Sequence, residues 1–257
     1  MDRKLFFFDV DGTILYNEKV SVRVQKAIEN IRKKGHLCFI ASGRPPAFIS
    51  KYIKDIGFDG FILCNGAVII HDGKVISESY LDYNKLKELV DFVEEVNNEY
   101  ILQTSTKSFI RKDCKNLLNF YSRCKIDFNE LQFDFNKEEQ LHRTSKMEIW
   151  PSDEEMRKEF IKRLRHFNYV SYPQTCLEIY SKEISKATGI KKLMKYLNIP
   201  FEQTYCFGDA SNDIEMFESV SHSYAMKNAN EDVKAKAKEV CPGVEEDGVA
   251  VILESLL

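Results

Sequence analysis

The chain has 257 residues, of which 44% are hydrophobic and 30% are charged, and its formal net charge is −3. This composition fits a folded protein with either one large α/β domain or a core and a smaller partner. The charge excludes a strongly basic face for nucleic acid and a polybasic signal for a membrane surface. Seven scattered cysteines without a C-x-x-C pair argue against a disulfide framework and against structural zinc.

The first part of the chain alternates short apolar runs with amphipathic segments. We expect strands at residues 5–8, 37–41 and 61–64, with helices at 22–34 and from Pro45 to near Gly57. The pattern resumes later, with strands at 205–207 and 223–226 and helices at 213–219 and 231–239. Strand–helix alternation predicts a doubly wound parallel sheet.

The middle of the chain has a different pattern, in which the expected strands and helices do not alternate regularly. We expect helices at 84–96 and 153–167, the second with Ser152 as N-cap, and strands at 100–104, 108–111, 146–150 and 177–180. Residues 112–137 show no clear period. The prediction is therefore an α/β core of residues 1–81 and 181–257, with a smaller α+β domain, residues 82–180, inserted in it.

The apolar run at residues 5–8 is too short for a signal peptide, and no later run approaches the length of a membrane span. We therefore expect a cytoplasmic protein with reduced thiols.

Two carboxylates end the first predicted strand, in the sequence Asp9-Val10-Asp11-Gly12-Thr13. Residues 6–8 are all Phe, so the strand is expected to be buried on both faces. Neither carboxylate can lie in that core unpaired, and the strand must end where the acids are solvated, bound to a metal or used.

A small hydroxyl and a glycine end the second strand, at Ser42-Gly43-Arg44, and Pro45 suits the first turn of a helix. Such a helix start can bind phosphate through its N–H groups, although on its own the pattern is more typical of a simple helix cap.

Two further patterns follow the inserted segment. Lys186 lies near a predicted helix start, where it opposes the helix dipole unless negative charge is close; alone it reads as a surface lysine. Asp209 ends a strand, and Asn212 and Asp213 begin the next helix.

In their order, these four patterns resemble the motifs of the haloacid dehalogenase superfamily, whose members are mostly magnesium-dependent phosphatases. The resemblance implies a Rossmann-like core with a cap inserted between the second and third motifs. The position of the insert and its α+β pattern resemble the type-two cap, subclass IIB, of the Cof-type branch. Lys182 and Lys191 do not match the position of the third motif, whereas Lys186 does.

The resemblance also implies roles for the residues. Mg²⁺ would be bound by the Asp9 carboxylate, the Asp11 backbone carbonyl and the Asp209 carboxylate, with Asp213 acting indirectly. Asp9 would be the nucleophile of an aspartyl-phosphate mechanism and Asp11 the acid and base. The substrate phosphate would be bound by Ser42, Gly43, Arg44, Lys186 and Asn212.

The expected substrate is a small phosphorylated metabolite, by resemblance a sugar phosphate, with nucleotides, flavin mononucleotide and pyridoxal phosphate as other candidates. We expect neither nucleic acid nor membrane as a partner. Two other functions stay open: a phosphomutase on the same core, and a non-catalytic sensor of a phosphorylated ligand. Residues of the cap would select the substrate, and the sequence does not identify them.

Overall fold

The computed structural model describes residues 3–256 and divides them into two compact units. Unit 1 holds the chain up to Gly43, Lys51–Ile76 and the chain from Ser185 onward; unit 2 holds Arg44–Ser50 and Ser77–Ile184. The predicted fold class, a parallel-sheet α/β core with a smaller inserted α+β unit, is confirmed. Among the described residues, no helix is both long and apolar enough to span a membrane.

Unit 1 is built on an eight-stranded sheet in the order β14-β13-β12-β1-β2-β3-β4-β5. The strands from β14 to β3 are parallel, and β4 returns antiparallel to β3. The strands are β1 (Leu5–Phe8), β2 (Leu37–Ala41), β3 (Gly60–Leu63), β4 (Val68–His71), β5 (Lys74–Glu78), β12 (Thr204–Gly208), β13 (His222–Met226) and β14 (Glu239–Cys241).

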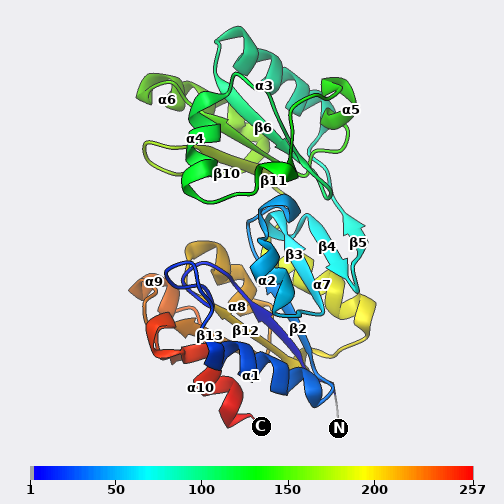
Figure 1. Ribbon diagram of the computed structural model, residues 1–257, viewed down its shortest axis with the longest axis vertical. Helices are drawn as coiled ribbons and strands as arrows, with labels where there is room; N and C mark the ends of the chain where they lie inside the picture. Colours follow the sequence, from blue (N-terminus) through cyan, green and yellow to red (C-terminus); the bar gives the residue numbers. More distant parts are fainter. Residues whose placement is uncertain (1–2, 257) are drawn as a thin grey trace. The chain divides into compact units, whose positions relative to one another are not determined.

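Helices cover this sheet as the blue, yellow and red ribbons of Figure 1. They are α1 (Val22–Lys33), α2 (Lys51–Asp55), α7 (Lys186–Leu197), α8 (Ile214–Glu218), α9 (Glu231–Lys234) and α10 (Gly248–Ser255). Helices α1 and α10 pack against each other, as do α7 and α8. Side chains on β1 are fully buried, and Leu5 and Phe7 share a core cluster with Ile190 and Leu193 of α7. The alternation of a strand places Phe6 and Phe8 on the opposite face.

Two details of unit 1 differ from prediction. The helix expected at 45–57 is a 3₁₀ turn at Pro46–Phe48 followed by the short α2, because Ala47 and Phe48 leave the helical path and are buried in a cluster of unit 2. The helix expected at 231–239 ends at Lys234, and the last residue of that span, Glu239, begins β14.

Unit 2 contains a six-stranded sheet in the order β10-β11-β9-β6-β7-β8, antiparallel except for the β7–β8 pair. Its strands are β6 (Glu99–Gln103), β7 (Ser108–Ile110), β8 (Leu131–Gln132), β9 (Lys146–Trp150), β10 (Phe167–Ser171) and β11 (Leu177–Ser181). Its helices are α3 (Tyr83–Glu95), α4 (Lys115–Arg123), α5 (Lys137–Leu141) and α6 (Glu154–Arg163).

Two details of helix α6 differ from prediction, and the segment without a clear period contains a further helix. The N-cap of α6 is Asp153, whose side chain accepts from the backbone N–H of Met156 at 2.8 Å; the N–H of Ser152 instead donates to Asn98. Helix α6 ends at Arg163, a 3₁₀ turn follows at Leu164–His166, and β10 begins at Phe167. The segment 112–137 contains α4. The units change at 76/77 and 184/185, compared with the expected 81/82 and 180/181, and residues 44–50 lie in unit 2.

Candidate active site

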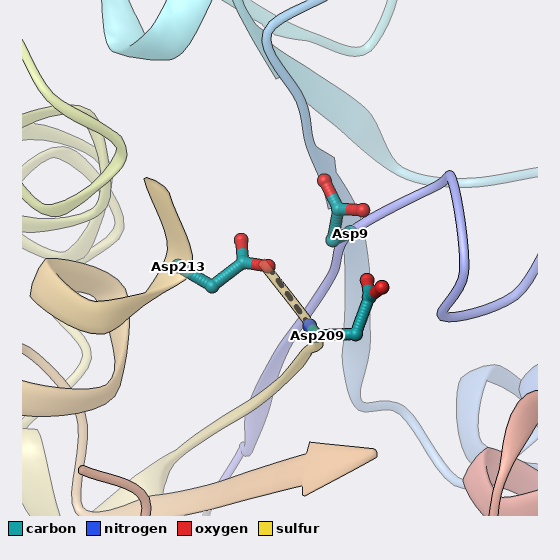
Figure 2. Close-up of side chains that lie close together, drawn as sticks. All are labelled: Asp9, Asp209 and Asp213. Atoms are coloured by element: carbon teal, nitrogen blue, oxygen red, sulfur yellow. Dashed lines mark hydrogen bonds between the residues drawn. The ribbon is translucent and has the colours of Figure 1, made fainter. Parts of the chain in front are cut away.

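The carboxyl ends of three neighbouring parallel strands bring the sequence motifs together. Because β12, β1 and β2 are adjacent, Asp209, Asp9 and Ser42 follow strands that end at the same edge of the sheet. The N–H of Asp9 donates to the Phe207 carbonyl at 3.0 Å, and that of Ser42 donates to the Ile62 carbonyl at 2.9 Å. Figure 2 shows the carboxylates of Asp9 and Asp209 close together, with Asp213 beside them.

Lys186 reaches this edge as a buried cation. Its Nζ lies 2.5 Å from Oδ1 of Asp9 and 2.6 Å from Oδ1 of Asp213. The lysine side chain and that of Asp213 are fully buried. The reading as a surface lysine is therefore wrong for Lys186, whereas Lys182 and Lys191 are exposed.

The start of α7 fixes the position of this lysine. Ser185 and Thr188 form a capping box, in which each side chain accepts from the backbone N–H of the other residue. Gly66 has φ +105° in the turn after β3, and a Cβ there would lie 2.1 Å from the Ser185 carbonyl oxygen. A Cβ on Gly189 would lie 3.0 Å from Cα of Gly66. Two backbones therefore touch directly beside Lys186.

Asp213 braces the loop that carries Asp209. Its Oδ2 accepts from the backbone N–H groups of Asp209 at 2.9 Å and Ala210 at 3.0 Å, the first of which is the dashed line in Figure 2. With Oδ1 bound to Lys186, both oxygens of Asp213 are engaged. This side chain therefore holds the loop and the lysine in place.

Asp209 is seated against the turn that follows β1. Thr13 donates through Oγ1 to Oδ1 of Asp209 at 3.0 Å. Gly12 has φ +81°, and a Cβ there would lie 2.3 Å from Oδ2 of Asp209. Only glycine leaves room for the Asp209 carboxylate at that point.

The burial of these acids shifts their pKa values. Desolvation raises the pKa of Asp9 from 3.8 to about 7, against the attraction of Lys186. Desolvation also raises the pKa of Asp209 to about 6, although the Thr13 hydrogen bond opposes it. Burial alone would lower the pKa of Lys186, but the charges of Asp213 and Asp9 raise it above its usual value. Three carboxylates thus face a single ammonium.

The remaining candidates have different settings. Asp11 is exposed, on a turn bridged to Leu15. Ser42 is 3% exposed. A Cβ on Gly43 would lie 3.0 Å from Oδ1 of Asn65, which also accepts from Nδ2 of Asn212 at 3.4 Å. Arg44 belongs to unit 2, and its guanidinium donates to the Phe48 carbonyl at 3.3 Å.

Sequence reasoning missed three side chains that build the site. Thr13 was part of the first motif but had no role assigned. Asn65 adopts a left-handed conformation, φ 55° and ψ 30°, which asparagine tolerates; the pair Asn65-Gly66 was a visible turn signal. Asn228 donates to the Gly12 carbonyl at 2.9 Å and accepts from the Val244 N–H at 3.0 Å. The segment Asn228-Ala229-Asn230 resembles a pattern of the Cof-type branch, but its contact with Gly12 spans 216 residues and the sequence alone assigned it no role.

The chemistry of the donor set suits a hard divalent cation. Asp9, Asp209 and Asp213 each offer a carboxylate oxygen, and these oxygens lie within 4.8 Å of one another. Lys186 occupies Oδ1 of Asp9, which leaves Oδ2 to face an ion. An all-oxygen set that includes two carboxylates with raised pKa values fits Mg²⁺, which would remove the repulsion between them.

Comparisons with known proteins agree with this geometry. Residues 6–253 match the family model described as haloacid dehalogenase-like hydrolase. The "Putative phosphatase YkrA" of Bacillus subtilis (strain 168) is 30% identical over 100% of this chain and 98% of its own. A 5-amino-6-(5-phospho-D-ribitylamino)uracil phosphatase of that organism, YitU, is 26% identical, over 97% of this chain and 96% of its own. The solved structure of the subclass IIB sugar phosphatase BT4131 superposes with a TM-score of 0.83 at 26% identity, covering 98% of each chain.

Proposed function

This chain belongs to the haloacid dehalogenase-like hydrolases and is a phosphatase of that superfamily, and we propose that it hydrolyses small phosphate monoesters, chiefly sugar phosphates, with Mg²⁺ and through an aspartyl-phosphate. The observation that carries the proposal is the convergence of Asp9, Asp209 and Asp213, with Lys186 paired to Asp9 and Asp213. A sugar phosphatase among the structural relatives supports the substrate class.

Asp9 is the proposed nucleophile. One of its carboxylate oxygens attacks the phosphorus in line, so that the new O–P bond forms as the bond from phosphorus to the ester oxygen breaks. Lys186 binds Oδ1 of Asp9, which fixes the carboxylate and supplies positive charge close to the phosphoryl oxygens. Ser42 and the N–H groups beside Gly43 would bind those oxygens on the other side.

Asp11 is the proposed acid and base. In the first step it gives its proton to the departing alkoxide; in the second it takes a proton from the water that hydrolyses the aspartyl-phosphate. Its exposed position on the turn after β1 leaves its side chain close to solvent. Asp9, in contrast, is buried, and it is the bound Mg²⁺ that would keep its carboxylate ionised for attack.

Asp9 and Asp209 would hold Mg²⁺ with the Asp11 carbonyl, and Asp213 would brace Asp209 from behind. When bound, the ion would offset charge on the transferred phosphoryl group and keep the Asp9 carboxylate ionised.

The test is phosphate release from p-nitrophenyl phosphate and from a panel of sugar phosphates, with Mg²⁺ and with EDTA. The wild-type protein should release free phosphate only with the metal, and Asp9→Asn should lose at least about 10³-fold in kcat. Asp55→Asn is a matched control, because Asp55 is an exposed aspartate that pairs with Lys51 on the surface of unit 1. Survival of activity in Asp9→Asn refutes the covalent mechanism, and return of the phosphoryl group to the sugar identifies a phosphomutase.

A further inference from the structure

Unit 2 contains a cavity of about 250 Å³ that is lined by residues from the first two turns of α3 and from the end of α6 onward to the start of β10. We call it the basic pocket, after its polar lining residues Lys85, Glu88, Lys162, Arg163, Arg165 and His166. All of these residues belong to unit 2, and none of them belongs to the site described above.

The rest of the lining is apolar and ties the basic pocket to one face of the sheet of unit 2. Leu89 and Phe167 line the cavity, are buried and share a hydrophobic cluster with Leu102 of β6. Residues 44–50 pack on the other face, where Phe48 shares a cluster with Ile101, the neighbour of Leu102 in the strand. The pocket is therefore a feature of unit 2 alone. Its charged groups lie beside an apolar layer, which strengthens their interaction with an ion.

Positive charge is in excess around the basic pocket, although the chain as a whole has a formal net charge of −3. The lining residues carry four formal positive charges and one negative charge, that of Glu88. Glu159 adds a second carboxylate nearby, which pairs with Arg163 at 3.2 Å and Lys162 at 3.4 Å. Lys182 adds a fifth cation, because its Nζ donates to the Arg165 carbonyl at 2.7 Å. The excess therefore persists when the neighbours are included.

Two of the cations have no acid to neutralise them. Among residues 3–256, neither Lys85 nor Arg165 forms an ion pair with a carboxylate. Arg165 donates through Nε to Nε2 of His166 at 3.1 Å, which orients the guanidinium plane. Its two terminal amino groups have no acceptor in the described part of the chain, so both are available to a ligand.

Helix electrostatics explains the cations at the end of α6 but not Lys85. Lys162 and Arg163 lie in the last turn of α6, where positive charge is favourable. Lys85 lies in the first turn of α3, where the helix dipole disfavours a cation, and no acidic residue of that turn compensates for it. Two helices thus bring like charges to one cavity, and a bound anion would remove the repulsion between them.

The volume of the basic pocket limits the size of that anion. A cavity of about 250 Å³ has room for about eight water molecules, at roughly 30 Å³ each. Inorganic phosphate, with five non-hydrogen atoms, would fill little more than half of it, whereas a diphosphate has nine. Arginine binds phosphoryl oxygens in pairs through its planar fork, and lysine binds them as a point charge.

We propose that the basic pocket binds a diphosphate group, either as free pyrophosphate or as the diphosphate end of a larger metabolite. Arg165 binds one phosphoryl group through its two terminal amino groups, and Lys85 binds the other from α3. Arg163 supplies further charge from a fixed position, since its guanidinium carbon lies 3.6 Å from the centroid of the Phe92 ring. The proposal does not depend on the phosphatase function.

The test is calorimetric titration of the full chain with inorganic pyrophosphate, in EDTA and at low salt. Without a metal, the carboxylates of the site in unit 1 repel an anion, so that binding reports the basic pocket. The wild type should bind one equivalent. Arg165→Gln should weaken binding by about tenfold or more, and Lys85→Gln by at least about threefold. Both residues are exposed, so both variants should keep the wild-type melting temperature.

Two matched controls remove the same charges elsewhere in unit 2. Arg123→Gln lies at the end of α4 and Lys158→Gln on α6; both residues are exposed and neither lines the pocket. Each control should leave the affinity for pyrophosphate within about twofold of the wild type, because a distant exposed charge is largely screened.

The proposal is overturned by a wild type that does not bind pyrophosphate, or by an Arg165→Gln effect no larger than that of Arg123→Gln. Inorganic phosphate that binds as tightly as pyrophosphate also overturns it. Titration with ADP separates the two sources: equal affinity supports the diphosphate end of a nucleotide, and absence of ADP binding supports free pyrophosphate. Because the titration contains no Mg²⁺ and follows no turnover, its failure leaves the phosphatase function untouched.

Discussion

Removal of the Lys186 charge should destabilise unit 1, because this ammonium separates two buried carboxylates. In Lys186→Met, Asp9 and Asp213 lose partners at 2.5 and 2.6 Å and keep their burial. Breaking a buried ion pair by removing one partner typically costs about 3–5 kcal/mol, since the other charge stays desolvated. At about 2–4 °C per kcal/mol for a unit of this size, the melting temperature should fall by about 6–20 °C.

The loss of stability in Lys186→Met should increase with pH. The pKa of Asp9 in the folded wild type is already raised to about 7, and removal of the lysine raises it further. At pH 5.5 the Asp9 carboxyl is protonated in both proteins, so Asp9 adds little to the difference there and the lost Asp213–Lys186 pair accounts for it. At pH 8 the variant must keep an uncompensated charge or hold a proton against the solution. The destabilisation should therefore grow from pH 5.5 to pH 8.

Circular dichroism through the thermal transition measures this effect for the whole chain. The single tryptophan, Trp150, lies in β9, so its fluorescence follows unit 2 separately. Lys191→Met is the control, since Lys191 is an exposed residue of the same helix. Adding Asp213→Asn to Lys186→Met should recover part of the loss. A melting temperature within about 2 °C of wild type at pH 8 refutes the role assigned to the lysine.

Three further outcomes follow from the site. Gly12→Ala should abolish Mg²⁺ binding by calorimetry, because its Cβ would lie 2.3 Å from the Asp209 carboxylate; unchanged binding contradicts the close approach. Mg²⁺ affinity should rise with pH up to about 7 and then level off, because the ion must displace protons from Asp9 and Asp209, whose pKa values are raised to about 7 and about 6; a flat profile from pH 5 to 8 counts against both shifts. Asn228→Ala, which frees the Gly12 carbonyl, should weaken Mg²⁺ binding by about tenfold, with equal affinity as the contrary result.

The sequence predicted the core well because each predicted strand is short, apolar and ended by residues that cannot be buried alone. The strand before Asp9 and the strand before Ser42 have the bounds that we expected. Lys186 had no distinguishing local signal; only its order among the motifs singled it out. The structure brings it to Asp9, although its role in phosphate transfer stays a prediction.

The parts that the sequence did not reveal depend on long-range contacts. The alternation of Lys146 and Glu148 with apolar neighbours is typical of a solvent-facing strand, yet both side chains are buried. That burial comes from packing around α4, in a segment whose period gave no helix signal. The departure of Phe48 from its expected helix has the same origin, since its ring finds a place beside Tyr121.

The backbone contact of Gly66 with Gly189 has an implication for how this architecture can diversify. The inserted unit returns to the core at Ser185, and within four residues the chain is clamped against the turn after β3. Whatever length or shape the insertion takes, the position of Lys186 is set by backbone contacts within unit 1. The inserted unit is in that sense a replaceable module, because its sequence can change without moving Lys186.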